Sequence, residues 1–144
     1  MFLAGGDAAD SFIYVSLGTN IDTTDLSGEI IRNLTEVFSA LSCKALWKTK
    51  GQHARSNLAS NIFTAKWPPL THPNIQAFVY HGGLRSAEKA VHYAAPLTGI
   101  PFLYNQDYRI YYLTSLGAAR HLDISACSKE DINNAIRDLL SDTR

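Results

Sequence analysis

The chain has 144 residues, and 46% of them are hydrophobic, which is enough for one domain with a buried core. Lysine and arginine together number 13, as do aspartate and glutamate, so the charge balance gives no support for a partner that is nucleic acid or an anionic membrane surface. The two cysteines, Cys43 and Cys127, provide neither a disulfide framework nor metal-ligand spacing, and we expect both to be buried thiols.

The sequence contains no segment that predicts attachment to a membrane. No apolar run approaches the roughly 20 residues that a helix needs to span a bilayer. The apolar start, Met1–Ala4, is too short for the core of a signal peptide. The sequence therefore predicts no membrane segment, and it does not assign the protein to a compartment.

The first part of the chain predicts a strand followed by a helix. Residues 1–11 read as a loose lead-in, and a single domain is expected over residues 12–144. Residues 12–17 are a continuous apolar run, which is typical of a strand buried on both faces of a parallel sheet. Residues 22–25 offer possible N-caps for an amphipathic helix. Its apolar face is predicted from residues at helical spacing: Leu26, Ile30, Leu34, Val37, Phe38 and Leu41.

Short apolar runs and helical patterns alternate through the rest of the chain. We predict further strands at residues 45–48, 62–66, 76–80, 97–102 and 117–122. We predict further helices at residues 84–94 and 108–115, and a last helix that begins at Ser128. This alternation predicts an α/β fold, in which a parallel sheet has helices on both faces.

Two of these helices have predicted core faces. In helix 84–94, the residues Leu84, Ala87, Val91 and Ala94 recur at helical spacing and are expected to face the core. Ser128 is an N-cap candidate with Asp131 three residues later, a spacing that favours a reciprocal cap. The apolar face of the last helix is expected to contain Ile132, Ala135, Ile136, Leu139 and Leu140.

A glycine turn joins strand 76–80 to helix 84–94. The order of strand, small-residue turn and helix leaves backbone N–H groups free at the helix start. Glycine has no Cβ, so a ligand can approach the backbone closely. His81 and Ser86 can donate hydrogen bonds and Arg85 adds positive charge, which together suit a diphosphate. The pattern alone is equally consistent with a plain tight turn.

Several polar or aromatic residues follow predicted strands. Ligands of parallel sheets bind at the carboxyl ends of strands, near the point where the strand order reverses. We therefore expect one shared edge for the following residues: Gly18, Thr19, Trp67, His81, Gly82, Gly83, Asn105 and Gln106.

These motifs resemble the signature of one enzyme family. The run His81-Gly82-Gly83-Leu84-Arg85-Ser86, followed by Gly99-Ile100-Pro101-Phe102 and Asn105-Gln106, closely resembles the UDP-glycosyltransferases, GT-B enzymes that move a sugar from a UDP-sugar to a small lipophilic acceptor. Residues 12–20, Leu46-Trp47-Lys48 and Lys66-Trp67 resemble that family in the same order. The resemblance is closest to the insect and insect-virus members, and it covers only their C-terminal, donor-binding half.

The resemblance implies a fold, an activity and partners. It implies a Rossmann-like parallel sheet with flanking helices, the C-terminal half of a GT-B fold. The implied reaction is hexosyl transfer to a hydroxyl group, with the UDP-sugar as donor substrate and no cofactor. No metal is expected, because no cluster of aspartates and histidines has ligand spacing. The implied partners are the UDP-sugar and a separate acceptor-binding domain or chain. Members are usually attached to the endoplasmic reticulum membrane or secreted, and the chain is expected to be a fragment, an incomplete gene product or a one-domain relative.

The resemblance also implies roles at the nucleotide. Trp67 would stack on the uracil ring, an interaction of about 1–3 kcal/mol per base in nucleic-acid systems. Gly18 and Thr19 would lie near the phosphates, and His81 would donate to the diphosphate and stabilise the departing UDP. The alternatives from the residues alone are a core tryptophan, a strand-ending turn and a structural histidine.

The remaining implied contacts are with phosphate and sugar. Gly82, Gly83 and Ser86 would complete the phosphate site, and Asn105 and Gln106 would contact sugar hydroxyls. The family usually has an acid where Asn105 stands. The amide oxygen still accepts a hydrogen bond, but it holds a hydroxyl less strongly than a carboxylate does. The alternative for this pair is a helix N-cap.

The sequence departs from the family in two further places. Lys89 stands where the family has a glutamate that accepts from both ribose hydroxyls, and an ammonium has no acceptor. Lys89 lies three residues after Ser86, on the same helix face, so we expect it to point at the cleft. After Trp67 the segment to His72 is shortened, and a glutamine that helps to recognise uracil has no counterpart.

The implied general base also lies outside this chain, in the acceptor-binding half. None of the other histidines, His53, His72, His92 and His121, matches its motif. We therefore expect the chain alone to be inactive, and no catalytic residue is assigned to it. Three alternatives remain open: a non-catalytic nucleotide-sugar-binding module, one chain of a split glycosyltransferase, and a decayed product without activity.

Overall fold

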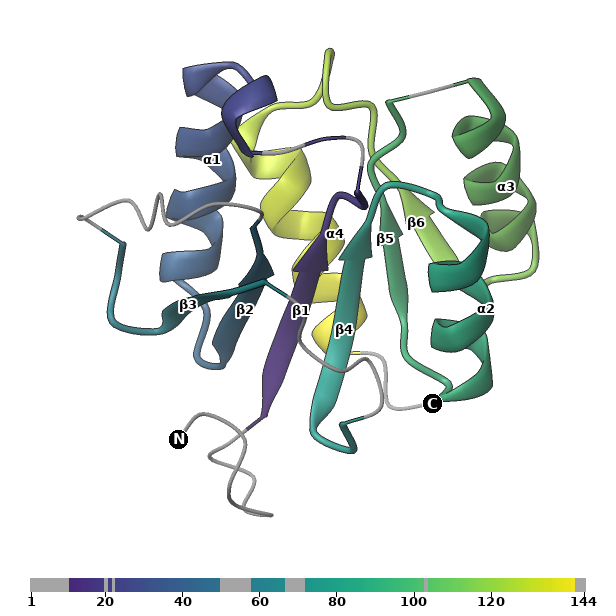
Figure 1. Ribbon diagram of the computed structural model, residues 1–144, viewed down its shortest axis with the longest axis horizontal. Coiled ribbons are helices and arrows are strands. Elements are labelled where there is room, and N and C mark those ends of the chain that lie inside the picture. The colour runs from purple at the N-terminus through teal and green to yellow at the C-terminus, as the bar shows by residue number, and fades with distance from the viewer. Residues whose placement is uncertain are drawn as a thin grey trace.

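A parallel six-stranded sheet forms the centre of the computed structural model (Figure 1). The structure describes residues 11–19, 21, 23–49, 58–66, 72–102 and 104–141. The strands are β1 (Phe12–Ser16), β2 (Lys44–Lys48), β3 (Ile62–Ala65), β4 (Ile75–Tyr80), β5 (Leu97–Gly99) and β6 (Ala119–His121). The α-helices are α1 (Gly28–Ser39), α2 (Leu84–His92), α3 (Tyr104–Ser115) and α4 (Lys129–Ser141), and a short 3-10 helix, η2, spans Thr23–Asp25.

Two helices cover each face of the sheet (Figure 1). Helices α1 and α4 pack on one face, where buried side chains alternate along β1 with those that point to the other face. Helices α2 and α3 pack on the opposite face, over Tyr14, Phe78, Tyr80 and Leu97. Every residue of β1 is buried, as expected for a central strand covered on both sides. The predicted α/β fold with a parallel sheet is confirmed.

The strand order is β3-β2-β1-β4-β5-β6, and all neighbouring strands are parallel. The chain therefore builds outwards from β1 through β2 to β3, and then returns to the other side of β1 to build β4, β5 and β6. The direction in which the chain adds strands reverses between β1 and β4. The loops that follow these two neighbouring strands therefore lead to opposite sides of the sheet. Such a switch point is where parallel sheets usually bind ligands.

Helices α1 and α4 match their predicted apolar faces. Most of the residues named for α1 are buried, and Leu26 and Ile30 are partly buried. Its N-cap is Ser27, whose hydroxyl accepts from the Ile30 N–H, and not a residue of the segment 22–25. At α4, the Ser128 Oγ accepts from the Asp131 N–H at 3.2 Å, and an Asp131 oxygen accepts from the Ser128 N–H at 2.8 Å, so the reciprocal cap is confirmed.

The predicted core face of α2 is wrong. Leu84 and Val91 are 54% and 55% exposed, and Ala94 is exposed as well. The buried residues are Ala87 and Ala90. The large rings of Phe78 and Tyr80 fill the space on this face of the sheet, so the helix approaches through alanines and its larger side chains lie outside the contact. Ala90 and Val91 both fit helical spacing from Ala87, and only the packing distinguishes them.

The last prediction that changes concerns β5 and α3. Helix α3 begins at Tyr104, not at residue 108, and β5 ends at Gly99. Asn105 and Gln106 therefore lie in the first turn of a helix and not in a loop. Both cysteines are free thiols. Cys43 is buried as expected, but the expectation was wrong for Cys127, which is only half-buried. Among the described helices, none is long and apolar enough to cross a membrane.

Candidate functional site

The loops after β1 and β4 meet at His81. The imidazole lies between two glycine backbones, one from each loop. A Cβ added to Gly18 would lie 2.6 Å from His81 Cε1 and Nε2, and one added to Gly83 would lie 2.7 Å from the same atoms. Gly18 also has a φ of +85°, which side chains rarely adopt. The two glycines that the sequence analysis singled out therefore leave the space that this histidine occupies at the switch point.

Helix α2 begins directly behind this histidine. Gly83 is its N-cap, with an extended backbone and no side chain that caps the helix. The first backbone N–H groups of a helix have no partner within it, and the Ala87 N–H is the donor that reaches the Gly83 carbonyl at 3.0 Å. The N–H groups of Leu84, Arg85 and Ser86 have no acceptor within the helix, so they can donate to a ligand. The helix dipole favours a ligand that is an anion.

The surroundings of His81 favour its neutral form. Burial lowers the pKa of its imidazole, the charges of Lys48 and Arg109 lower it further, and the Ser16 backbone acts in the opposite direction. Its buried Nδ1 has no hydrogen-bond partner among the described residues. A neutral imidazole carries one proton, so His81 has a single donor to share between the Ser16 backbone and a bound group.

The lowered pKa of His81 predicts a pH dependence. A histidine that resists protonation in the folded state stabilises it above the unfolded pKa of about 6.5, and this contribution is lost as the pH falls towards the folded pKa. We expect His81→Gln, which cannot be protonated, to reduce the fall in melting temperature between about pH 7 and pH 5. Thermal unfolding at a series of pH values tests this. An equal fall in melting temperature in both proteins would show that folding does not lower the pKa of His81.

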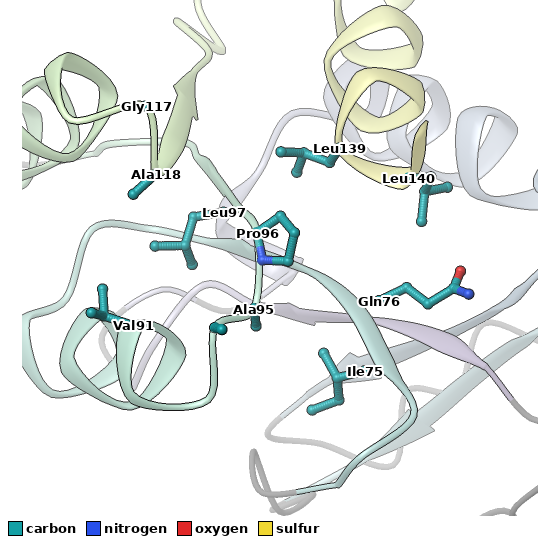
Figure 2. A pocket seen from close by; sticks show the side chains of 11 residues that line it. Ile75, Gln76, Val91, Ala95, Pro96, Leu97, Gly117, Ala118, Leu139 and Leu140 are labelled. Carbon is teal, nitrogen blue, oxygen red and sulfur yellow. The ribbon is translucent and has the colours of Figure 1, made fainter. Parts of the chain in front are cut away.

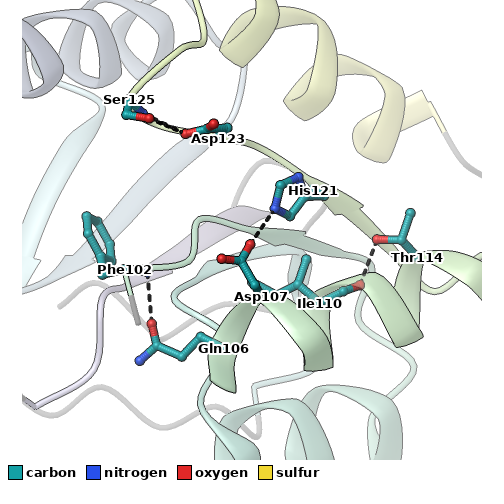
Figure 3. A network of polar contacts seen from close by, with 8 residues as sticks. All are labelled: Phe102, Gln106, Asp107, Ile110, Thr114, His121, Asp123 and Ser125. Carbon is teal, nitrogen blue, oxygen red and sulfur yellow. Dashed lines mark hydrogen bonds and ion pairs between the residues drawn. The ribbon is translucent and has the colours of Figure 1, made fainter. Parts of the chain in front are cut away.

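Helix α3 closes the other side of the glycine turn. Gly82 has a φ of +95°, and a Cβ there would lie 2.8 Å from Gln106 Cβ and 3.0 Å from the Gln106 carbonyl oxygen. Gln106 is only 7% exposed, and its Oε1 accepts from the Phe102 N–H at 2.9 Å (Figure 3). Its side-chain oxygen therefore bonds back to the backbone just before α3, as the third helical residue of a capping box does. Neither Asn105 nor Gln106 is the N-cap that was the alternative for this pair, because both lie within α3. Asn105 is exposed in the same turn.

A pocket of about 770 Å³, lined by several polar and aromatic residues, lies beside Asn105, between α3 and the end of β6. Asp107 and His121 line it, and the Asp107 Oδ1 and His121 Nε2 lie 3.0 Å apart (Figure 3). The ring of Tyr111 stacks on His121 with the centroids 4.4 Å apart. Sequence reasoning missed this group, because its members come from separate elements and share no motif.

A second pocket, of about 440 Å³, lies at the opposite edge of the sheet (Figure 2). Ile75 and Leu97, the first residues of β4 and β5, line it together with Val91 and Leu139. It is mainly apolar and lies at the amino ends of the strands, away from His81. Parallel sheets usually bind ligands at the carboxyl ends of their strands, so the candidate site is the one that contains His81.

The remaining predicted residues are placed as follows. Thr19 is exposed next to Gly18, and Ser86 is half-buried in the first turn of α2. Lys89 is exposed on α2. Trp67 and the shortened segment that follows it lie outside the described residues. In the part of the chain that the structure describes, no group of three or more histidine, cysteine or acidic side chains could hold a metal ion.

A family model described as UDP-glucoronosyl and UDP-glucosyl transferase matches residues 4–144. The chain belongs to this family. It is 31% identical over 133 residues to an ecdysteroid UDP-glucosyltransferase of Lacanobia oleracea granulosis virus, and 31% identical over 140 residues to UDP-glucosyltransferase 2 of Dactylopius coccus. These matches cover 89% and 94% of the chain, which spans 29% and 27% of the two relatives.

Solved glycosyltransferases have the same fold as this UDP-glycosyltransferase chain. A spinosyn rhamnosyltransferase complexed with thymidine diphosphate matches with a TM-score of 0.82 and 17% identity, over 99% of this chain and 40% of its own. The glycotransferase of kitacinnamycin matches with a TM-score of 0.80 and 24% identity, over 94% of this chain and 36% of its own. The Rossmann-like fold of a GT-B glycosyltransferase, which the resemblance implied, is confirmed.

Proposed function

We propose that this chain is the donor-binding domain of a UDP-glycosyltransferase. It would bind a UDP-sugar at the carboxyl edge of β1 and β4 and contribute to hexosyl transfer to a hydroxyl of a small lipophilic acceptor. One observation carries the proposal: the backbones of Gly18 and Gly83 both lie against the His81 ring at the switch point of the sheet. This arrangement puts a neutral donor beside the free N–H groups of a helix start.

The diphosphate of the donor fits these groups by charge and by hydrogen bonding. The N–H groups at the start of α2 and the proton of His81 are donors, and a diphosphate offers only acceptors. When the bond between sugar and UDP breaks, negative charge grows on the departing diphosphate, and fixed donors stabilise that charge without reorganisation. The proposed roles of Trp67 at the uracil and of Asn105 and Gln106 at the sugar follow from the family motif.

The relatives support the proposed substrate class. The two named above are a UDP-glucosyltransferase and an ecdysteroid UDP-glucosyltransferase, which supports a UDP-hexose donor and a lipophilic acceptor. The chain spans less than a third of their length, so we place the acceptor site and the general base in a separate domain or chain. This chain would then supply donor binding and stabilisation of the leaving group.

A calorimetric titration of the full chain with UDP, and in parallel with UMP, tests the donor site. We expect UDP to bind at least about tenfold more tightly than UMP, because the second phosphate gains charge-assisted hydrogen bonds from α2 and His81. Equal affinities for UDP and UMP would contradict a diphosphate site. The absence of binding to either nucleotide would leave the fold as a scaffold without a donor site.

One observation favours an alternative function, a non-catalytic nucleotide-sugar-binding module. Lys89 is an exposed ammonium on α2 where the family has an acceptor for the ribose hydroxyls. Such a chain would keep the fold and bind UDP weakly. Mixing it with the acceptor-binding half of a viral relative would separate the two functions, because only a competent donor domain would restore glucosyl transfer.

A further inference from the structure

Arg109 connects helix α3 to the glycine turn. The Arg109 Nη1 donates a hydrogen bond to the carbonyl oxygen of Gly82. The two residues lie 27 positions apart, and nothing in the sequence pattern indicates the contact. Arg109 also borders the pocket beside Asn105. Its guanidinium therefore lies between the start of α2 and the pocket next to the predicted sugar contact.

The turn that Arg109 holds is packed tightly against α3. A Cβ on Gly82 would lie 2.8 Å from Gln106 Cβ and 3.0 Å from Ile110 Cδ1, both of which belong to α3. The helix thus fixes the turn by steric contact on one side, and Arg109 fixes it by a hydrogen bond to the peptide that joins Gly82 to Gly83. A change in this bond would reach the start of α2 directly, since Gly83 is its N-cap.

We propose that Arg109 is a positioning residue of the diphosphate site, which holds the Gly82–Gly83 peptide against α3 and strengthens its N–H as a donor to the bound anion. This inference rests on the proposed donor site. A guanidinium is always charged, and a carbonyl that accepts from it becomes more polarised. Polarisation passes through the peptide to the Gly83 N–H, since hydrogen bonds in a chain strengthen one another.

The charge of Arg109 also acts on His81. Burial is the largest cause of the lowered His81 pKa, and the cations that add to it are Lys48 from β2 and Arg109 from α3. The Ser16 backbone from β1 opposes them. Tyr80, whose ring centroid lies 6.5 Å from that of His81, is uncharged, because burial raises its pKa to about 12. Arg109 thus adds positive potential to the site and disfavours the protonated form of His81.

The test compares the wild-type full chain with Arg109→Gln and Arg109→Lys. NMR titration gives the His81 pKa from its ring protons and the affinity for UDP from amide shifts. We expect Arg109→Gln to raise the His81 pKa and to weaken UDP binding by about tenfold, the lower range for a lost charged hydrogen bond. Arg109→Lys keeps the charge, so its affinity should stay within about threefold and its His81 pKa should stay low. Arg137→Gln, at an exposed position of α4, is the matched control.

The outcomes separate the two proposals. Failure of the wild-type chain to bind UDP would overturn the donor site and the role of Arg109 with it. The role of Arg109 alone would be overturned if Arg109→Gln bound UDP within twofold of the wild-type affinity. An unchanged His81 pKa in that variant would overturn it as well. If Arg109→Gln does not fold, Arg109→Lys decides: a tenfold loss of affinity in a folded lysine variant would contradict a role that depends on charge.

Discussion

Gly18→Ala is expected to remove UDP binding and to destabilise the fold. Gly18 has a φ of +85°, and a Cβ there would lie 2.6 Å from two atoms of the His81 ring. Alanine is strained at that φ, and its Cβ would clash with the His81 ring, which also packs closely against Gly83. We expect a loss of about 1–3 kcal/mol in the free energy of unfolding, the usual cost of such a backbone strain. Urea unfolding and calorimetry with UDP measure the two effects.

Gly28→Ala is the matched control for this substitution. Gly28 is the first residue of α1, its φ lies outside the left-handed region, and a Cβ there would meet nothing within 4 Å. We expect this variant to bind UDP like the wild type and to be at least as stable, because alanine favours helix formation over glycine. Undiminished UDP affinity in Gly18→Ala would mean that the β1 loop does not take part in the site.

Lys89→Glu is expected to tighten UDP binding by about tenfold. A carboxylate at this position can accept hydrogen bonds from ribose hydroxyls, and charge-assisted bonds of this kind are the stronger class. Lys89 is exposed on α2 three residues after Ser86, so the substitution meets no packing constraint. Calorimetry with UDP and with its 2′-deoxy form measures the effect. The gain should be smaller for the deoxy nucleotide, which lacks one of the two hydroxyls.

The control for Lys89→Glu must match its change in charge. Arg137→Glu makes the same change on α4, at an exposed position far from the glycine turn, and we expect it to leave UDP affinity within about twofold. Lys89→Gln removes the cation without adding a carboxylate, and should fall between the wild type and Lys89→Glu. Weaker binding in Lys89→Glu would show that the ammonium attracts the diphosphate and that position 89 does not face the ribose.

Local sequence determined most of the elements and the centre of the candidate site. The alternation of strands and helices follows from apolar periodicity, which depends on neighbouring residues. The reciprocal cap of Ser128 and Asp131 is equally local. Glycines between a strand and a helix indicate that some other group comes close to the backbone there. The structure shows that the His81 ring is the group that lies close to Gly18 and Gly83.

Helix periodicity could not determine which face of α2 is buried. Ala90 and Val91 lie three and four residues after Ala87, so either can share its helix face. Which of the two is buried depends on the volume of Phe78 and Tyr80 beneath the helix. The start of α3 was misplaced for a related reason. The Gln106 side chain bonds back to the Phe102 N–H and starts the helix earlier than its apolar pattern suggests.

The sequence by itself determined that the chain is a parallel α/β domain with a histidine and glycine turn at a strand end. Only the tertiary structure decided what surrounds that turn. The approach of Gly18 to His81 depends on β1 and β4 being neighbours, the Arg109 bond depends on how α3 packs on Gly82, and the Asp107–His121 pair depends on α3 meeting β6. These contacts join residues distant in the sequence, and their geometry is set by the packing of whole elements, which no local pattern encodes.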